Sequence, residues 1–325
     1  MAFDKTKFDR NRLRGVHLVP LTAFDERGKI NFAVQERHIA RLSQAGVRIF
    51  MPAAGTGEFH SLSADEIVDV VKLTRTVAGP DALIFAPVGI QTQHAIEVGQ
   101  RSLKAGADGV MFMPLLHPYL CDAGAKDYYT QILEPLRCPA LIYKRSSVPS
   151  DKLLLELADT PYVVGIKYAE NQMHEFRKTV MADQGRIEWL CGTAERFAPY
   201  YMLAGATGFT SGAGNLCPHL ALALHAALAG GEYSEAMRYQ QLILPIEDYR
   251  ERAGESYNIS LLKTAMQLIL NEDFGPARSP QRAITPSEHA EIARLLEPVM
   301  EAEREISKEA ETIGLAARKQ TAKGI

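Results

Sequence analysis

The chain has 325 residues, of which 46% are hydrophobic and 23% charged, a composition that supports a large core and is ordinary for a soluble enzyme. Its formal charge of −3 gives no reason to expect nucleic acid or an anionic membrane as a partner, and its most apolar helix-like stretch, 218–228, is about half the ~20 residues of a membrane span. The four cysteines form no C-x-x-C pair and the N-terminus has no apolar signal-like segment, so we expect free thiols and a cytoplasmic location.

Three helix-like segments end in the same Ala-Gly pair and then enter an apolar strand-like segment. The pairs stand at 45–46, 105–106 and 204–205. Glycine just past a helix end supplies the left-handed conformation, and the residues after it enter a buried strand. Weak repetition of this junction predicts a chain built from helix-to-strand units.

Eight strands alternate with amphipathic helices over the first two thirds of the chain. This number favours a parallel (β/α)8 barrel over an open doubly wound sheet, and no G-x-G-x-x-G follows the first strand. Ser63 and Glu66 predict a capping box at one helix start. The predicted strands are 15–22, 47–53, 82–88, 109–114, 139–145, 163–168, 186–192 and 206–211; the predicted helices between them are 33–45, 64–78, 92–105, 124–135, 150–159, 170–182 and 195–203.

After the eighth strand the pattern is almost wholly helical, at 218–229, 233–250, 257–271 and 286–314. We interpret this part as the eighth barrel helix plus a helical extension packed on the barrel. The charge-rich end, from Glu301 to Lys323, is typical of a solvated helix face and tail. The predicted organisation is therefore an N-terminal arm (1–14), the barrel core (15–217), the C-terminal helices (218–315) and a tail (316–325).

Lys167 is the most informative single residue, because it stands near the end of the otherwise apolar, strand-like run 163–169. An ammonium group is costly to bury, so a lysine there favours the neutral amine. A lysine whose pKa is lowered in this way is a nucleophile toward carbonyl groups. The sequence thus indicates a candidate for imine chemistry.

Strand alternation predicts which side chains accompany this lysine. Leu141, Tyr143 and Arg145 share one face of the fifth strand, while Val163, Gly165 and Lys167 share a face of the sixth. If both faces line the barrel interior, Tyr143 approaches Lys167 and Gly165 leaves room for the lysine stem. A core tyrosine and a salt-bridged rim arginine are the alternative interpretations of Tyr143 and Arg145.

Reactive groups of a (β/α)8 barrel lie at the C-terminal ends of its strands, so the polar residues there form the candidate site. The turn Gly55-Thr56-Gly57 offers backbone N–H groups and a hydroxyl, which suit a carboxylate. Further candidates for substrate binding stand at the ends of the last two strands: Gly192, Thr193, Thr210 and Ser211.

The sequence does not favour a metal site, a serine-nucleophile elbow or a phosphate-binding loop. The histidines show no H-x-x-x-H or H-x-H spacing, few acidic residues stand at strand ends, and neither a G-x-S-x-G elbow nor a Walker loop is present. We therefore expect no metal and no external cofactor.

Several motifs in the same order resemble the dihydrodipicolinate synthase / N-acetylneuraminate lyase family, over about residues 14–300. They are V-P-L-T-A-F-D-E-R-G at 19–28, G-T-G-E at 55–58, I-Y at 142–143, G-I-K at 165–167 and G-T-A-E at 192–195. The resemblance implies a barrel with C-terminal helices that assembles as a tetramer or dimer. It also implies that Lys167 forms an imine with the C2 carbonyl of a 2-keto acid, that Tyr143 transfers protons, and that Thr56 belongs to the catalytic machinery.

Departures from the lysine-biosynthetic members point to another branch. Their G-T-T-G-E turn has a threonine where this chain has Gly55, and Leu116 and Val148 stand near the places of their relay tyrosine and arginine. G-T-G-E-F at 55–59, Tyr-x-Arg at 143–145 and G-P-A-R at 275–278 are more similar to 5-dehydro-4-deoxyglucarate dehydratases. In that branch Arg145 is a candidate for a second anionic or polyhydroxy end of the substrate.

The first hypothesis is a class I lyase that dehydrates a deoxy keto sugar acid, with or without decarboxylation. The second is a pyruvate-dependent aldolase or retro-aldolase of the same family. The third is a barrel that binds a keto acid or a partner without turnover, which the departure at Gly55 favours.

Overall fold

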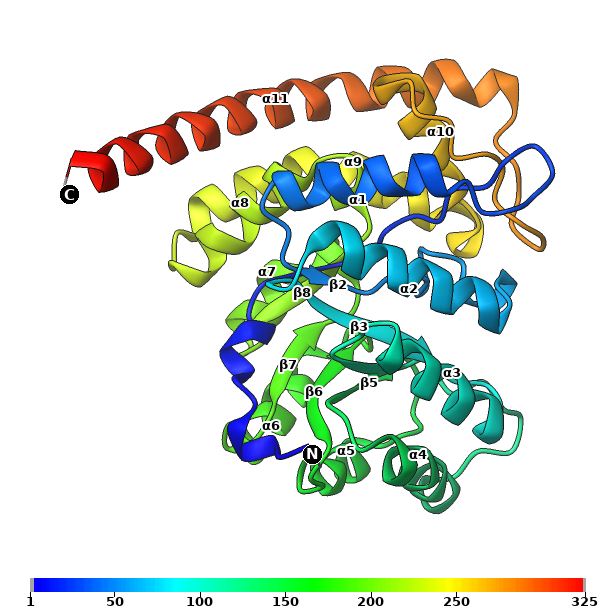
Figure 1. The fold of residues 1–325 in the computed structure, drawn as a ribbon. Helices are drawn as coiled ribbons and strands as arrows, with labels where there is room; N and C mark the ends of the chain where they lie inside the picture. Colours follow the sequence, from blue (N-terminus) through cyan, green and yellow to red (C-terminus); the bar gives the residue numbers. More distant parts are fainter. Residues whose placement is uncertain (1–2, 324–325) are drawn as a thin grey trace.

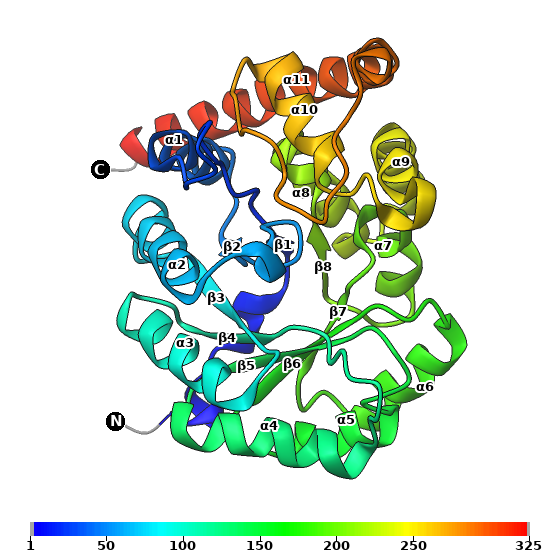
Figure 2. The ribbon, with the colours of Figure 1, turned by 90° about the vertical axis from the view of Figure 1, so that its right-hand side faces the viewer.

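The structure, a computed structural model, describes residues 3–323 and contains a closed barrel of eight parallel strands (Figures 1 and 2). Each strand pairs with the next in sequence, and β8 closes the ring on β1 through the pair Thr210 and His17. The predicted fold is confirmed, and all eight predicted strands are present. They are β1 (Val16–Leu18), β2 (Ile49–Phe50), β3 (Leu83–Val88), β4 (Gly109–Phe112), β5 (Ala140–Lys144), β6 (Val163–Tyr168), β7 (Glu188–Cys191) and β8 (Gly208–Ser211).

Helices surround the barrel and continue beyond it. The predicted capping box is confirmed at the start of α2, where the Ser63 and Glu66 side chains each accept the other residue's backbone N–H. The α-helices are α1 (Phe32–Gln44), α2 (Ala64–Ala78), α3 (Thr92–Lys104), α4 (Asp122–Leu136), α5 (Asp151–Ala158), α6 (Met173–Asp183), α7 (Ala194–Leu203), α8 (Pro218–Ala229), α9 (Tyr233–Glu255), α10 (Ser260–Leu270) and α11 (Pro286–Lys323). Short 3-10 helices lie at Lys5–Lys7, Arg10–Leu13, Phe59–Ser61 and Ala213–Asn215.

The strands alternate between an interior and a helix-facing layer, with one irregularity in β6. The register between β5 and β6 shifts at Ala140 and Leu141. Val164 therefore packs with the interior residue Leu141, whereas Val163 belongs to the helix-facing core. The prediction that Val163 shares a face with Lys167 was wrong, because a bulge in a strand pair interrupts the strict alternation.

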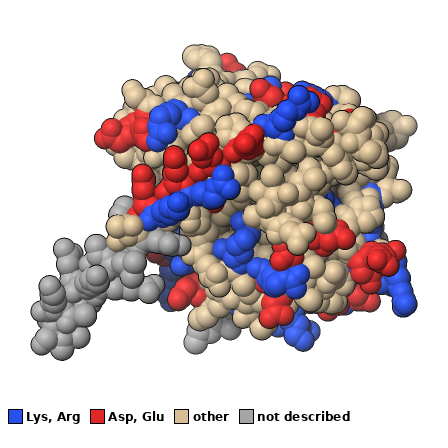
Figure 3. Space-filling view, turned by 90° about the horizontal axis from the view of Figure 1, so that it is seen from above, with Lys and Arg blue, Asp and Glu red and all other residues tan. Residues whose placement is uncertain are grey.

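The C-terminal helices pack on one side of the barrel. Helix α11 contacts α8, α9 and α10, and the Glu303 carboxylate accepts the backbone N–H groups of His219 and Leu220 at the start of α8. Helix α11 runs through the predicted division at 315 as far as Lys323, and the last two residues of the predicted tail lie outside the described range. Figure 3 shows acidic and basic side chains in adjacent rows on the face of the molecule where α11 lies. No helix within residues 3–323 is apolar and long enough to cross a membrane.

The N-terminal arm packs against the end of the barrel where the strands begin. Lys5 Nζ donates to the carbonyl oxygens of Ala158 and Thr160, at 2.6 and 3.2 Å, and Arg14 pairs with Glu188 on β7. These contacts fix the arm against the N-terminal ends of the strands. The open end of the barrel is therefore the C-terminal one.

A buried ion pair joins α10 to the turn after β2. Lys263 Nζ lies 2.6 Å from Glu58 Oε1, and both side chains are almost fully buried. The second carboxylate oxygen of Glu58 accepts the backbone N–H of Arg278 at 2.8 Å. The turn that carries Gly55 and Thr56 is thus fixed in place by contacts with α10 and with the backbone of Arg278.

Replacing Lys263 with methionine should lower the free energy of unfolding by about 3 kcal/mol, because the Glu58 carboxylate would remain buried without a counter-charge. Chemical denaturation of the full chain measures this change. Arg37→Met is the control, since it breaks the largely exposed pair with Glu272 and should have little effect. Equal, small effects of the two variants would mean that the buried pair does not hold the turn.

Candidate active site

A cavity of about 970 Å³ opens at the C-terminal ends of the strands. Predicted site residues from five strand ends form its wall, which agrees with the general position of active sites in such barrels. The members of the predicted set that line it are Gly55, Thr56, Tyr143, Arg145, Lys167, Gly192, Thr193, Thr210 and Ser211.

Gly57 is the one predicted residue outside this wall. A Cβ atom there would lie 2.9 Å from the backbone of Ala53 and from the carbonyl oxygen of Pro20, and its own carbonyl accepts the Thr22 hydroxyl at 2.7 Å. The glycine lets the turn pack tightly against the loop after β1. Gly57 therefore has a packing role in the turn and lies outside the cavity wall.

Lys167 and Tyr143 lie side by side, as the strand pattern predicted. The two residues are register partners between β5 and β6, and Lys167 Nζ is 3.8 Å from the centroid of the Tyr143 ring. Burial, and to a smaller extent the nearby Arg145 charge, lowers the pKa of Lys167 to about 7. Burial also raises the pKa of the Tyr143 phenol.

Comparison with the other buried lysines explains why this amine is distinctive. Lys144 lies 2.8 Å from a carboxylate oxygen of Glu170, and Lys263 is paired with Glu58. Within residues 3–323, Lys167 Nζ has no carboxylate partner and only 5% of the residue is exposed. A buried ammonium without a counter-charge is unstable, so the neutral, nucleophilic amine is accessible near neutral pH.

The glycine that makes room for the lysine stem is Gly192, at the end of β7. A Cβ atom at this position would lie 3.1 Å from Lys167 Cγ and 2.9 Å from the Tyr168 carbonyl oxygen. Gly165, which was predicted to have this role, instead faces the Glu188 carbonyl and Leu141. Gly165 differs from its predicted role because of the bulge in β6 and the position of the neighbouring strand, and neither feature can be seen in the sequence.

The turn after β2 exposes its backbone toward the cavity. Ala53 and Glu58 bracket it with left-handed angles, φ +58° and +68°, and a Cβ at Gly55 would meet nothing within 4 Å. Among the bonds formed within residues 3–323, the N–H groups of Gly55 and Thr56 have no acceptor. Two backbone N–H groups and a hydroxyl are the kinds of donor that can bind a carboxylate.

The hydroxyl groups on the far strands are already partly engaged. Thr193 donates to Asn171 Oδ1 at 2.9 Å, and Ser211 donates to the buried Glu195 carboxyl group while accepting the Gly214 N–H. Burial raises the pKa of Glu195, and the nearby Glu247 raises it further, so this carboxyl favours its protonated form. Ser211 is thereby fixed as part of the wall.

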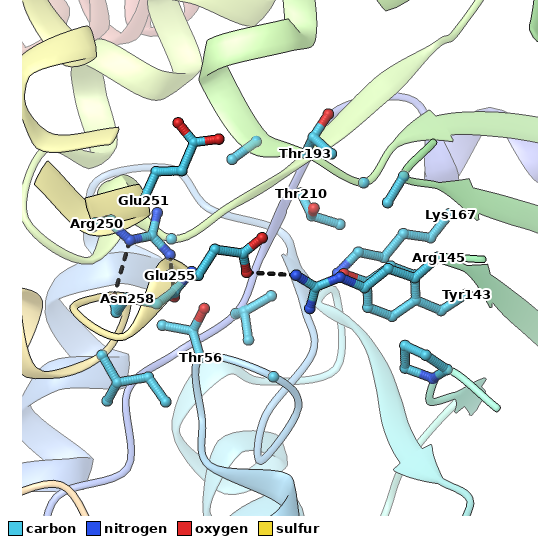
Figure 4. A pocket seen from close by; sticks show the side chains of 18 of the residues that line it. Thr56, Tyr143, Arg145, Lys167, Thr193, Thr210, Arg250, Glu251, Glu255 and Asn258 are labelled. Atoms are coloured by element: carbon cyan, nitrogen blue, oxygen red, sulfur yellow. Dashed lines mark hydrogen bonds and ion pairs between the residues drawn. The ribbon is translucent and has the colours of Figure 1, made fainter. Parts of the chain in front are cut away.

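Sequence reasoning missed the residues that α9 and its C-terminal end contribute. Figure 4 shows Arg250, Glu251, Glu255 and Asn258 across the cavity from Lys167. Glu255 Oε2 lies 2.5 Å from Arg145 Nη2, so the alternative interpretation of Arg145 as a salt-bridged rim residue holds together with its place in the cavity wall. The only signal in the sequence was Gly254, a glycine between the predicted helices 233–250 and 257–271.

No group of three His, Cys, Asp or Glu side chains is arranged as metal ligands in the described part of the chain. The site is instead composed of one amine, one phenol, a backbone turn and paired arginines. Such a set is suited to covalent chemistry on a carbonyl compound.

The closed barrel and the cavity at the C-terminal ends of its strands define a (β/α)8-barrel enzyme. The model of the dihydrodipicolinate synthetase family matches residues 12–299, and the chain belongs to that family and is a lyase of it. The family resemblance seen in the sequence motifs is confirmed.

Curated relatives and solved structures give the same result. Two proteins named probable 5-dehydro-4-deoxyglucarate dehydratase, from Chelativorans sp. and Rhizobium rhizogenes, are 31% and 29% identical, with 88% and 87% of this chain and 95% and 94% of theirs covered. Dihydrodipicolinate synthase from Bacillus clausii superposes with a TM-score of 0.85 at 33% identity, over 89% of this chain and 98% of its own. Sialic acid aldolase from Ruminococcus gnavus, at 18% identity and a TM-score of 0.83 over 91% and 99% of the two chains, shares the fold.

Gly192→Ala should displace the Lys167 stem and lower the free energy of unfolding by about 1–3 kcal/mol, because the added methyl group overlaps backbone and lysine atoms. Denaturation reports the stability, and the rate at which an amine-selective reagent acylates Lys167, followed by peptide mass analysis, reports its position. Gly55→Ala, which adds a methyl group in open space, should leave both readouts close to wild type. If both alanine variants behave alike, Gly192 does not determine the position of the lysine.

Proposed function

We propose that the chain is a class I lyase in which Lys167 forms an imine with the C2 carbonyl of a 2-keto acid, and that it dehydrates a deoxy keto sugar acid. The observation that carries the proposal is the buried Lys167 amine, which has no carboxylate partner within residues 3–323 and lies beside the Tyr143 ring at the wall of a large cavity. No external cofactor is required, because the protein's own amine supplies the electrophilic imine.

In the first stage the turn at Gly55 and Thr56 holds the substrate carboxylate next to the amine. The neutral Lys167 amine adds to C2, and the resulting carbinolamine loses water to give a protonated imine. We assign the proton transfers of this exchange to Tyr143, and the position of its ring against the amine supports this role. Holding both partners in the cavity makes the addition effectively intramolecular.

In the second stage the imine acts as an electron sink. Removal of a proton from C3 gives an enamine, whose electrons expel the C4 hydroxyl group as water after its protonation. Hydrolysis of the conjugated imine then releases the product and the free lysine. The water lost on imine formation is regained on hydrolysis, so the net change is loss of one water molecule from the substrate.

Dehydration is preferred over C–C cleavage because the curated relatives described above are named as probable dehydratases. The retro-aldolase alternative is retained because the sequence motifs also resemble N-acetylneuraminate lyases. The two reactions differ in product, since cleavage gives pyruvate and an aldehyde. Product analysis also distinguishes simple from decarboxylating dehydration, and turnover of any substrate excludes the non-catalytic barrel.

We also propose a substrate class, a cellular location and an oligomeric state for the protein. A small 2-keto acid as the partner, a cytoplasmic location and a homo-oligomer, either a tetramer or a dimer, fit a metabolic enzyme of this family. Leu116 lines the cavity, and Tyr119 lies three residues further along the chain; the two are 77% and 87% exposed and are large apolar groups of the kind that subunit contacts cover. Nucleic acid is not part of the proposal, since the net charge is slightly negative.

Incubation with pyruvate and borohydride should add one reduced pyruvate to the protein, located on Lys167 by peptide mass analysis. Lys167→Ala should abolish the adduct and the turnover of keto sugar acids while the unfolding curve stays cooperative. An adduct on a different lysine, or turnover by the alanine variant, would contradict the assignment of the nucleophile.

Tyr143→Phe should slow imine formation or proton transfer roughly 10²–10⁴-fold, because the phenol is the proposed general acid and base. Stopped reactions with borohydride separate the imine-forming step from later steps. Wild-type rates in the phenylalanine variant would make Tyr143 a packing residue.

A further inference from the structure

The end of α9 has an unusual backbone at the mouth of the cavity. Ala253, Gly254 and Glu255 have successive left-handed angles, φ +49°, +67° and +65°. Residues other than glycine adopt this conformation at a cost, and such backbone persists where surrounding contacts enforce it. The stretch ends the helix and carries the Glu255 carboxylate to Arg145, which Figure 4 shows between Glu255 and Lys167.

Glu255 completes a pattern in which the arginines of the cavity wall are already neutralised. Among the lysines and arginines that line the cavity, Lys167 is the one without an ion-pair partner in the described part of the chain. The pairs are Arg145 with Glu255 at 2.5 Å, Arg196 with Asp248 at 3.0 Å and with Glu251, Arg250 with Glu247 at 2.5 Å, and Arg282 with Glu288 at 3.3 Å.

This charge balance bears on the end of the substrate that points away from the imine. The first carboxylate is assigned to the Gly55 and Thr56 turn under the proposed function, and both residues line the cavity. A second carboxylate near Arg145 would compete with Glu255 for the guanidinium and would be repelled by it. Hydroxyl groups, in contrast, donate hydrogen bonds that the carboxylate oxygens of Glu255 accept.

We propose that Glu255 is a specificity-determining residue that selects 2-keto-3-deoxy sugar acids with a neutral, hydroxyl-bearing distal end over dicarboxylates of the same length. The inference rests on the proposed lyase function and names the substrate class of the same site. It separates this chain from the relatives described above, whose names specify a glucarate derivative, a diacid.

The test compares kcat/KM for a six-carbon 2-keto-3-deoxy monoacid and for the diacid that has a carboxylate in place of its terminal CH2OH group. Wild type should prefer the monoacid by at least about tenfold, and Glu255→Gln should move the ratio toward the diacid by roughly 10–100-fold, since it removes the repulsion and frees Arg145. Glu291→Gln is the matched control, because it removes the same charge from a pair with Arg252 near the same segment. The control should keep the wild-type ratio.

Binding measurements keep this inference separate from the proposed reaction. Gluconate and glucarate lack the keto group, so calorimetric titration of both into wild type and Glu255→Gln reports distal selection even if no imine forms. The wild-type preference for gluconate should also fall as salt is raised, a readout that needs no variant. An unchanged ratio in Glu255→Gln, or a wild-type preference for the diacid in turnover and binding, would overturn the inference.

Discussion

The site depends on one electrostatic constraint, the burial of an amine without a counter-charge. A buried cation is tolerated when a carboxylate lies next to it, as for Lys144 and Lys263 in this same chain. Lys167 has the burial but, within residues 3–323, not the partner, and its pKa falls to about 7 because of burial and then of Arg145. The protein thereby keeps a nucleophile available at neutral pH without a separate base.

The rest of the structure maintains this constraint by geometry. The register of β5 and β6 sets Tyr143 against the amine, and Gly192 leaves space for the lysine stem. The Glu58 and Lys263 pair fixes the turn at Gly55 and Thr56, the proposed carboxylate site, from the side of the C-terminal helices. Charges that would stabilise the ammonium are used elsewhere, since Glu255 and Glu247 face arginines.

Much of this arrangement could be predicted from the sequence, because barrel strands and helices have strong periodic patterns. Lys167 and Tyr143 could also be predicted as site residues, since each stands at the end of an apolar strand. The role of Gly192 and the position of Val163 could not be predicted, because they depend on a neighbouring strand and on a bulge. Glu255 was missed because a left-handed helix end outside the barrel pattern brings it to the site.

The account is tested most directly by nitrogen-15 NMR titration of the lysine side chains, with Lys167→Ala used to assign the resonance of Lys167. Because the folded-state pKa is lowered, the amine should be protonated below pH 7 and neutral above it. The account predicts a titration midpoint near 7. A midpoint near the ordinary lysine value of 10.5 would contradict it, since the amine would then be a charged group at neutral pH.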